Sequence, residues 1–370
     1  MRILRTLDWQ IITPTIFLIV LGLITLLSAS MPYAEKMWHN PYHFFTKQLI
    51  SLVLASLCAC FCFYIRPIWW QRWRYGLIFL SFILLFAVFV PGIGVTVKGS
   101  SRWLSLGFMN LQVSECVKLA VFIYMAGFID QHHDDLRWSF KGFIKPLIVL
   151  SLISSLIILE PDFGAVCVIL FVALCQMYVC GSRLRYMVFL ALGVMIVLAV
   201  VLWMAPYRLE RLTAFWDPWL VADKKGYQVI HAMMAVKSGG LLGVGLGESI
   251  EKWFYLPEAH NDFLLAILIE ECGILALVGV MLGYGLIFSR MLQLAMSFIH
   301  RKDWFTGSLV YGIAMWWSIQ ALINIGVNIG MLPTKGITLP LMSYGGSSLM
   351  AFAASLGIVL RIAMQHEEVK

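Results

Sequence analysis

The fold is decided by the stretch FLLAILIEECGILALVGVMLGYGLIFS, residues 263–289, in which only Glu270 and Glu271 carry charge. A helix needs about 20 mostly apolar residues to cross the hydrocarbon core of a bilayer, so the stretch predicts a membrane-spanning helix. The segment EAHND, residues 258–262, comes directly before it. Two carboxylates, an imidazole and an amide therefore gather at the entrance of a predicted span.

The composition indicates that the rest of the chain is also predominantly apolar. It has 370 residues, of which 61% are hydrophobic and 13% are charged. A soluble domain cannot bury so much apolar surface, so we expect an integral membrane protein that binds no nucleic acid despite its formal charge of +7. The eight cysteines lie in or beside apolar runs and lack zinc-ligand spacing, which argues against a disulfide framework. The first apolar run is long enough to be a true span.

About ten apolar runs predict an all-α integral membrane protein with one polytopic domain over residues 1–370. With ten spans, both termini lie on one side of the membrane. That side carries more than twice as many Lys and Arg as the other, once the long loop at about 205–262 is set aside. Both termini are therefore predicted to be cytoplasmic, and the long loop, between spans 7 and 8, to be extracytoplasmic. The predicted spans are 11–30, 47–65, 75–91, 113–130, 143–160, 164–180, 186–204, 263–289, 305–331 and 345–363.

Two observations limit the chemistry of the outer face. The sequence has no GxxxxGK[ST] motif, and the run GGLLGVGLG at residues 239–247 lacks the strand and helix flanks of a dinucleotide fold. That run is either a phosphate cradle or a flexible or re-entrant loop. Because ATP is not expected outside the cell, a reaction there needs a substrate that carries its own leaving group in the membrane.

Four polar clusters on the predicted outer side are candidates for a site, because ionisable groups within spans usually face a cavity or a partner. In the first cluster Arg102 precedes Glu115 and Lys118, which share one helix face at their i, i+3 spacing. The two form either a self-compensating ion pair or the charged wall of a substrate cavity. Ser114 is placed to cap their helix.

The second cluster is EPDFG, residues 160–164, where Asp162 either caps the next helix or serves the site.

The fourth cluster, nearest the C-terminus, is LPTKG at residues 332–336 with SYGGSS at residues 343–348. Lys335 either extends to the lipid headgroups or contacts an anionic substrate group. The small residues of this cluster permit close helix packing.

The third cluster is the segment that precedes the run of residues 263–289. Asn261 or Asp262 is placed to be the N-cap of the following helix. Capping alone does not explain the presence of Glu258 and His260 beside them. We therefore favour a catalytic role for this cluster.

Together the clusters resemble the SEDS family (shape, elongation, division and sporulation) of polytopic peptidoglycan polymerases. The resemblance covers nearly the whole chain, with the motifs in order and a long outer loop after the seventh span. EPDFG and LPTKG are similar to the forms of the division members more than to those of the elongation members. The chain departs from the family pattern at Val113, where proline is usual, and at Asn261, where threonine often precedes the aspartate.

The resemblance implies an inverting glycosyltransferase that joins lipid II units through β-1,4 bonds. The glycan moves from its undecaprenyl diphosphate carrier, in α linkage, to the 4-hydroxyl of another lipid II, at the outer face of the bacterial inner membrane and at the division septum. The resemblance also implies that Asp262 is the catalytic general base. The residues predicted to line the substrate cavity are Glu115, Lys118, Asp162, Arg102, Lys335, His260 and Ser343.

The departing diphosphate needs positive charge. We assign this role to Arg102, Lys118 and Lys335, with a divalent ion such as Mg²⁺ or Mn²⁺ as a further candidate whose ligands the sequence does not identify. The expected partners are a class B penicillin-binding protein, because the chain has no transpeptidase domain, together with division proteins and membrane lipids.

Three competing interpretations remain open at the level of the sequence. A lipid II flippase or other transporter would use Glu270 and Glu271 as an ion path, since they lie roughly 12 Å deeper than Asp262 at 1.5 Å per residue. The same two acids are equally compatible with hydrogen bonds to neighbouring helices. An elongation-type polymerase and a non-catalytic scaffold for division proteins are the other two interpretations.

Overall fold

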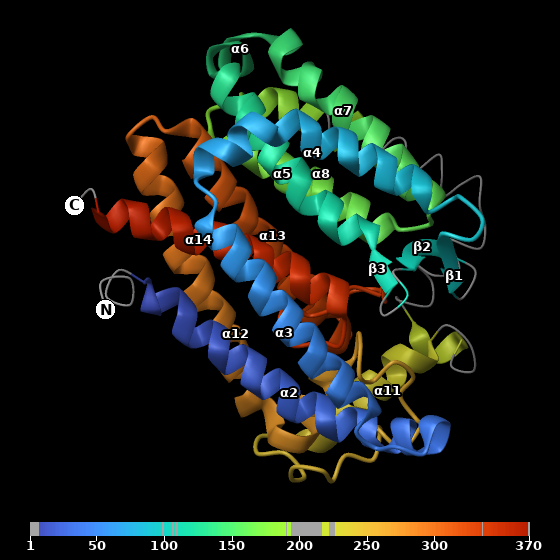
Figure 1. The fold of residues 1–370 in the computed structure, drawn as a ribbon. Helices are drawn as coiled ribbons and strands as arrows, with labels where there is room; N and C mark the ends of the chain where they lie inside the picture. The colour runs from blue at the N-terminus through green and yellow to red at the C-terminus, as the bar shows by residue number, and fades with distance from the viewer. Residues whose placement is uncertain are drawn as a thin grey trace.

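The computed structural model describes residues 7–97, 100–105, 107, 110–189, 191–193, 217–221, 226–334 and 336–368. These residues form a bundle of long helices with a small sheet (Figure 1). The start of α2 and the end of α14 lie at one end of the bundle, and the sheet lies toward the opposite end. The helices are α2 (Trp9–Trp38), α3 (His43–Tyr64), α4 (Pro67–Ala87), α5 (Val113–Gln131), α6 (His133–Trp138), α7 (Phe140–Leu159), α8 (Phe163–Val179), η1 (Pro218–Val221), α11 (Tyr227–Gly239), α12 (Leu264–His300), α13 (Trp304–Asn328) and α14 (Gly346–Glu368).

Six of the described helices are long and apolar enough to cross a membrane, namely α2, α3, α7, α12, α13 and α14. The predicted spans 75–91, 113–130 and 164–180 are also helical, as α4, α5 and α8, but α8 is shorter and the other two carry more polar residues. Most of the predicted span 186–204 lies outside the described residues. The protein is therefore a multi-pass helical membrane protein, and the count of ten spans stays a prediction.

The core lies where α5, α13 and α14 meet. Trp316 of α13 contacts Phe122 of α5 and Phe352 of α14, with ring centroids 5.6 and 4.6 Å apart, and all three rings are buried. The outer surfaces of α3 and α4 instead expose large apolar rings, such as Phe61 and Phe79. Such a surface suits lipid tails and not water.

Local sequence signals explain where several helices begin. The Asp8 carboxylate accepts a hydrogen bond from the Gln10 amide at 3.2 Å and caps α2. Asp303 caps α13 in the same way. Pro67 stands in the first turn of α4, where its missing N–H removes no helical bond.

A three-stranded antiparallel sheet corrects the all-α prediction. It consists of β1 (Gly94–Val97), β2 (Ser100–Ser105) and β3 (Asn110–Gln112), in the order β1-β2-β3. Val95 pairs with Trp103, which in turn pairs with Gln112. β-Branched and aromatic residues favour strands, but these strands are too short to stand out beside long apolar runs. The sheet leads directly into α5 and fixes the position of its first residues.

The long loop predicted at about 205–262 contains regular structure within its described residues. Helix α11 lies within it and packs on α12, burying Val229, Ile230, Ala232 and Ala235. In the following segment, residues 240–263, Leu256 and His260 are buried. Residues 205–216 and 222–225 of the predicted loop lie outside the described residues.

Helix α12 is broken at Gly273, whose φ of 75° and ψ of −176° lie outside the helical region. In a regular helix the Glu270 and Glu271 carbonyls would accept bonds from residues 274 and 275. The glycine-rich segment 240–245 replaces both partners, so part of the run 239–247 is bonded to α12 at the break. The four replacing bonds run from Ile274 N to Gly240 O (3.0 Å), Leu275 N to Leu241 O (3.4 Å), Val244 N to Glu270 O (2.9 Å) and Gly245 N to Glu271 O (3.0 Å).

The side chains of Glu270 and Glu271 hold the same outer segment. The Glu270 carboxylate accepts bonds from the Ser249 hydroxyl and from the Ile250 amide, the latter at 3.0 Å. The Glu271 carboxylate forms an ion pair with Lys252 at 2.9 Å. Both acids are therefore bonded to a neighbouring segment of the chain, where the sequence interpretation had expected neighbouring helices.

Candidate active site

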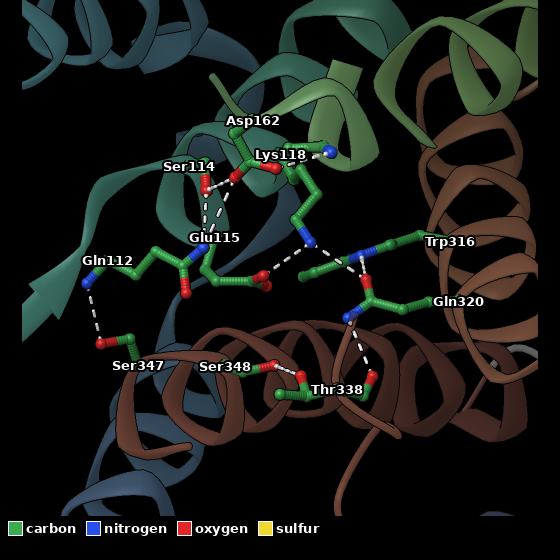
Figure 2. Close-up of polar contacts among 11 residues, drawn as sticks. Gln112, Ser114, Glu115, Lys118, Asp162, Trp316, Gln320, Thr338, Ser347 and Ser348 are labelled. Carbon is green, nitrogen blue, oxygen red and sulfur yellow. Dashed lines mark hydrogen bonds and ion pairs between the residues drawn. The ribbon is translucent and has the colours of Figure 1, made fainter. Parts of the chain in front are cut away.

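The pocket that contains half of the six predicted charged residues lies between the start of α5, the start of α8, α13 and the segment 336–337. It brings together Glu115 and Lys118 of α5 and Asp162, the N-cap residue of α8 (Figure 2). The residues that line the pocket are Gln112, Glu115, Lys118, Asp162, Gly164, Ala165, Val168, Gln320, Gly336 and Ile337.

Glu115 and Lys118 form an ion pair of 2.8 Å on α5, which confirms that they share one helix face. Lys118 also donates to the Gln320 side-chain oxygen at 2.9 Å, and its ammonium lies 5.3 Å from the centre of the Trp316 ring. The side chains of the pair are only 8% and 3% exposed. A buried ammonium with these three partners is well compensated.

Asp162 has two roles at once. Its Oδ1 caps α8 by accepting from the Ala165 amide at 3.2 Å, which confirms the capping interpretation. Its Oδ2 accepts from the Ser114 hydroxyl at 3.0 Å. Ser114 thus binds Asp162 and does not cap α5, whose N-cap position is Gln112. The hydrogen bond ties the start of α5 to the start of α8 across the pocket.

Asp262 is half-buried and lies just before α12. A Cβ added to Gly336 would lie 3.4 Å from Asp262 Oδ2, so the carboxylate lies against a residue that also lines the pocket. The predicted N-caps, Asn261 and Asp262, are wrong: Phe263 holds that position. The Asn261 amide donates instead to Glu258 at 2.5 Å.

Arg102 lies in β2, and its side chain forms hydrogen bonds to two backbone carbonyls. Its guanidinium donates from Nε to the Glu160 carbonyl at 2.9 Å and from Nη2 to the Pro161 carbonyl at 2.6 Å. These bonds hold the sheet against the turn that precedes Asp162. The structure therefore gives Arg102 a clear role in placing that turn.

The other predicted residues lie apart from the pocket or outside the described residues. His260 is buried among aromatic rings, with centroid distances of 5.4 Å to Tyr33 and 4.6 Å to Phe44. The Ser343 hydroxyl accepts from the Leu339 amide at 3.0 Å and stabilises a turn. Lys335 lies outside the described residues, directly before Gly336.

Glu160, in the turn between α7 and α8, has an unusual environment. The residue is fully buried, and within the described part of the chain neither carboxylate oxygen has a hydrogen-bond partner. Burial, reinforced by the nearby Asp162 carboxylate and opposed by Arg102, raises the pKa of Glu160 to about 8. The side chain is therefore mainly protonated at neutral pH.

Sequence reasoning missed three residues that shape the site, namely Gln320, Asn324 and Asn328. They are buried amides at every fourth position of α13. Their spacing was a usable signal, because amides in a membrane helix are expensive unless they are bonded.

No group of three or more His, Cys, Asp or Glu suited to a metal ion occurs among the residues that the structure describes. The carboxylates of the pocket are already bonded to Lys118, Ser114 and the α8 amide.

Fold and site together define a multi-pass membrane protein with a charged pocket built from α5, α8 and α13. The chain belongs to the FtsW/RodA/SpoVE family, whose model, described as "Cell cycle protein", matches residues 8–368. It is 42% identical to the "Probable peptidoglycan glycosyltransferase FtsW" of Thioalkalivibrio sulfidiphilus, over 99% of this chain and 92% of that one. The protein of the same name from Coxiella burnetii is 41% identical, over 98% of each chain.

Solved structures share the fold. RodA of Thermus thermophilus, a rod shape determining protein, superposes with a TM-score of 0.70 at 25% identity, over 96% of each chain. A chain from a peptidoglycan synthase complex superposes with a TM-score of 0.79 at 24% identity, over 97% of this chain and 98% of that one.

Proposed function

We propose that this chain is a peptidoglycan glycosyltransferase that polymerises lipid II into β-1,4-linked glycan strands during cell division. Relatives that are 42% and 41% identical over nearly the whole chain carry the name "Probable peptidoglycan glycosyltransferase FtsW". The reaction takes place at the outer face of the cytoplasmic membrane, where lipid II carries its own diphosphate leaving group.

One observation carries the chemical part of the proposal. The half-buried Asp262 carboxylate lies against Gly336, which also lines the pocket that holds Glu115, Lys118 and Asp162. A base and a polar cavity thus share a wall, which is the arrangement that general-base catalysis on a bound acceptor needs.

In the proposed step, Asp262 takes the proton of the acceptor 4-hydroxyl as that oxygen forms a bond to the anomeric carbon of the donor. The bond from that carbon to the diphosphate oxygen breaks, and its electron pair leaves with the diphosphate. Attack from the opposite face converts the α linkage into a β linkage. No second acid is required, because a diphosphate leaves without being protonated.

Lys118 and Lys335 are the candidates for stabilising the departing diphosphate. Arg102 is less suited, because it does not line this pocket and its guanidinium is bonded to two backbone carbonyls. Lys118 lines the pocket, and Lys335 precedes the pocket residue Gly336. An unchanged KM and kcat for lipid II after neutralisation of both lysines would reject this assignment.

The decisive experiment uses the purified full chain in detergent with fluorescent lipid II, with and without a class B penicillin-binding protein. We expect glycan polymer from the wild type and none from Asp262→Ala, with both proteins showing the same thermal unfolding. Polymerisation by Asp262→Ala at the wild-type rate would disprove its role as the base. Movement of lipid II across liposomes without any polymer would instead support a transporter.

The assignment to division and to a septal location follows the FtsW names of the relatives. The class B penicillin-binding protein is the proposed partner, since glycan strands require cross-linking after polymerisation. Depletion of the protein should give filamentous cells. Round cells would assign the chain to elongation instead.

A further inference from the structure

Helix α13 carries a line of four buried polar side chains on one face. They are Trp316, Gln320, Asn324 and Asn328, each at most 1% exposed. A step of four residues turns the helix by only about 40°, so the four side chains follow one another along the bundle. The line begins at Gln320 and Trp316 beside Lys118, and it ends at the start of α12.

The two asparagines converge on one atom, the backbone carbonyl oxygen of Asp262. Asn324 Nδ2 donates to it at 3.0 Å and Asn328 Nδ2 at 2.9 Å. Asn328 Oδ1 also accepts from the Ala266 amide at 2.9 Å. A single side chain thus binds the carbonyl before α12 and an amide of its first turn.

This double contact replaces a cap that α12 lacks. Its N-cap residue, Phe263, has no side-chain cap bond, and Glu258 shortly before it has a φ of 59°. A helix start without a cap of its own frays, and a frayed start would leave Asp262 without a fixed position. Helix α13 supplies the missing partners from outside.

Asn324 also reaches the opposite wall of the site. Its Nδ2 donates to the Ile337 carbonyl at 2.7 Å, next to Gly336, against which the Asp262 carboxylate lies. Gln320 donates to the following carbonyl, that of Thr338, at 3.3 Å (Figure 2). One amide group therefore sets the distance between the Asp262 backbone and the segment 336–338.

We propose that Asn324 and Asn328 are positioning residues that hold Asp262 in place for proton transfer. This inference rests on the proposed function of Asp262. Both amides act through backbone and do not touch the reacting atoms. A shift of the base by 1 Å is enough to lower a rate by about 10²-fold.

The chain offers a matched control in Gln176 of α8. Its Nε2 also donates to two backbone carbonyls, those of Phe122 at 3.2 Å and Ser308 at 3.0 Å, and the residue is fully buried. Ser308 lies roughly 24 Å from Asn324 along the axis of α13, at 1.5 Å per residue. Asn324→Ala and Gln176→Ala thus remove the same kind of bonds at different distances from Asp262.

The test measures polymerisation of fluorescent lipid II over a range of concentrations and pH, together with thermal unfolding of each variant. We expect both single variants to lower the unfolding temperature to a similar extent. Gln176→Ala should keep kcat within about twofold, whereas Asn324→Ala should lower kcat at least about tenfold with little change in KM. The double variant Asn324→Ala/Asn328→Ala should approach the 10²-fold loss. The acidic limb of the kcat/KM profile should move in Asn324→Ala, because it reports the ionisation of the base.

Two results overturn the inference, and they differ from a failure of the proposed function. If Asn324→Ala loses no more rate than Gln176→Ala, or if its pH profile coincides with that of the wild type, the amides have only a structural role. If Asp262→Ala polymerises normally, the assignment of the base fails, and the inference fails with it. Because the single variant keeps the bonds of Asn328 to the Asp262 carbonyl and the Ala266 amide, the experiment does not depend on the double variant folding.

Discussion

The ion pair between Lys252 and Glu271 provides the sharpest test of how the outer segment is held. The two side chains are 5% and 1% exposed and lie 2.9 Å apart. Lys252 also donates to Ser28 at 2.9 Å and to the Gly247 carbonyl at 2.5 Å, so all three of its protons have partners. Lys252→Met removes the positive charge and leaves the Glu271 carboxylate buried.

Removal of one partner from a buried pair typically lowers the free energy of unfolding by about 3–5 kcal/mol. For a chain of 370 residues, at an unfolding entropy of about 2.1 cal/mol/K per residue, a loss of 4 kcal/mol corresponds to a fall of about 5 °C in Tm. Glu271→Gln should have a similar effect, because it leaves the ammonium without its counter-charge. The double variant removes both charges and should be more stable than either single variant.

Thermal unfolding of the four proteins in one detergent, followed by tryptophan fluorescence, checks the prediction. A double-mutant cycle gives the coupling energy between the two residues. If the two single losses simply add in the double variant, the residues do not form the stabilising pair that the structure shows. If each single variant lowered the free energy of unfolding by less than about 1 kcal/mol, the reasoning would also be refuted. Such small losses are typical of ion pairs that are exposed to water.

Two further predictions follow from the turn at Glu160 and the break at Gly273. The pKa of Glu160, raised to about 8, means that the folded state binds a proton more tightly than the unfolded state, so this residue's contribution to stability falls as pH rises from about 4.5 to 8. Glu160→Gln should therefore raise Tm at pH 8 and flatten the dependence of Tm on pH, and equal slopes for the two proteins would contradict this. Gly273→Ala should lower Tm, because its φ is 75° and the added Cβ would lie 2.2 Å from the Leu241 carbonyl oxygen. Gly279→Ala, in open helix with no contact below 3.8 Å, is the control that should leave Tm nearly unchanged.

Much of the framework could be predicted from the sequence, because long apolar runs and helix spacing are local signals. The i, i+3 spacing of Glu115 and Lys118 predicted their ion pair, and the turn EPDFG predicted the cap at Asp162. The short sheet gave only a weak signal, and the break at Gly273 depends on a segment about thirty residues earlier in the chain.

The site was less predictable where the hydrogen-bond and packing partners of a residue come from helices that are distant in sequence. The N-cap of α12 was misplaced because α13, and not the preceding residues, supplies the hydrogen bonds. Glu270 and Glu271 could not be interpreted from periodicity, which does not identify the groups that face them. His260 was expected at the cavity because it is close to Asp262 in sequence, yet its ring packs against α2 and α3.

The break in α12 also bears on how the protein is assembled during synthesis. Segment 240–245 leaves the ribosome before α12 does, whereas α13, with its two asparagines, leaves later. Alone, α12 can close its own backbone bonds and enter the membrane as one uninterrupted apolar helix, since unpaired amides in hydrocarbon cost several kcal/mol each. In the folded protein the earlier segment has taken over part of these bonds, so the break in α12 requires that segment to be present. The placement of Asp262 and its helix therefore depends on residues synthesised both before and after it.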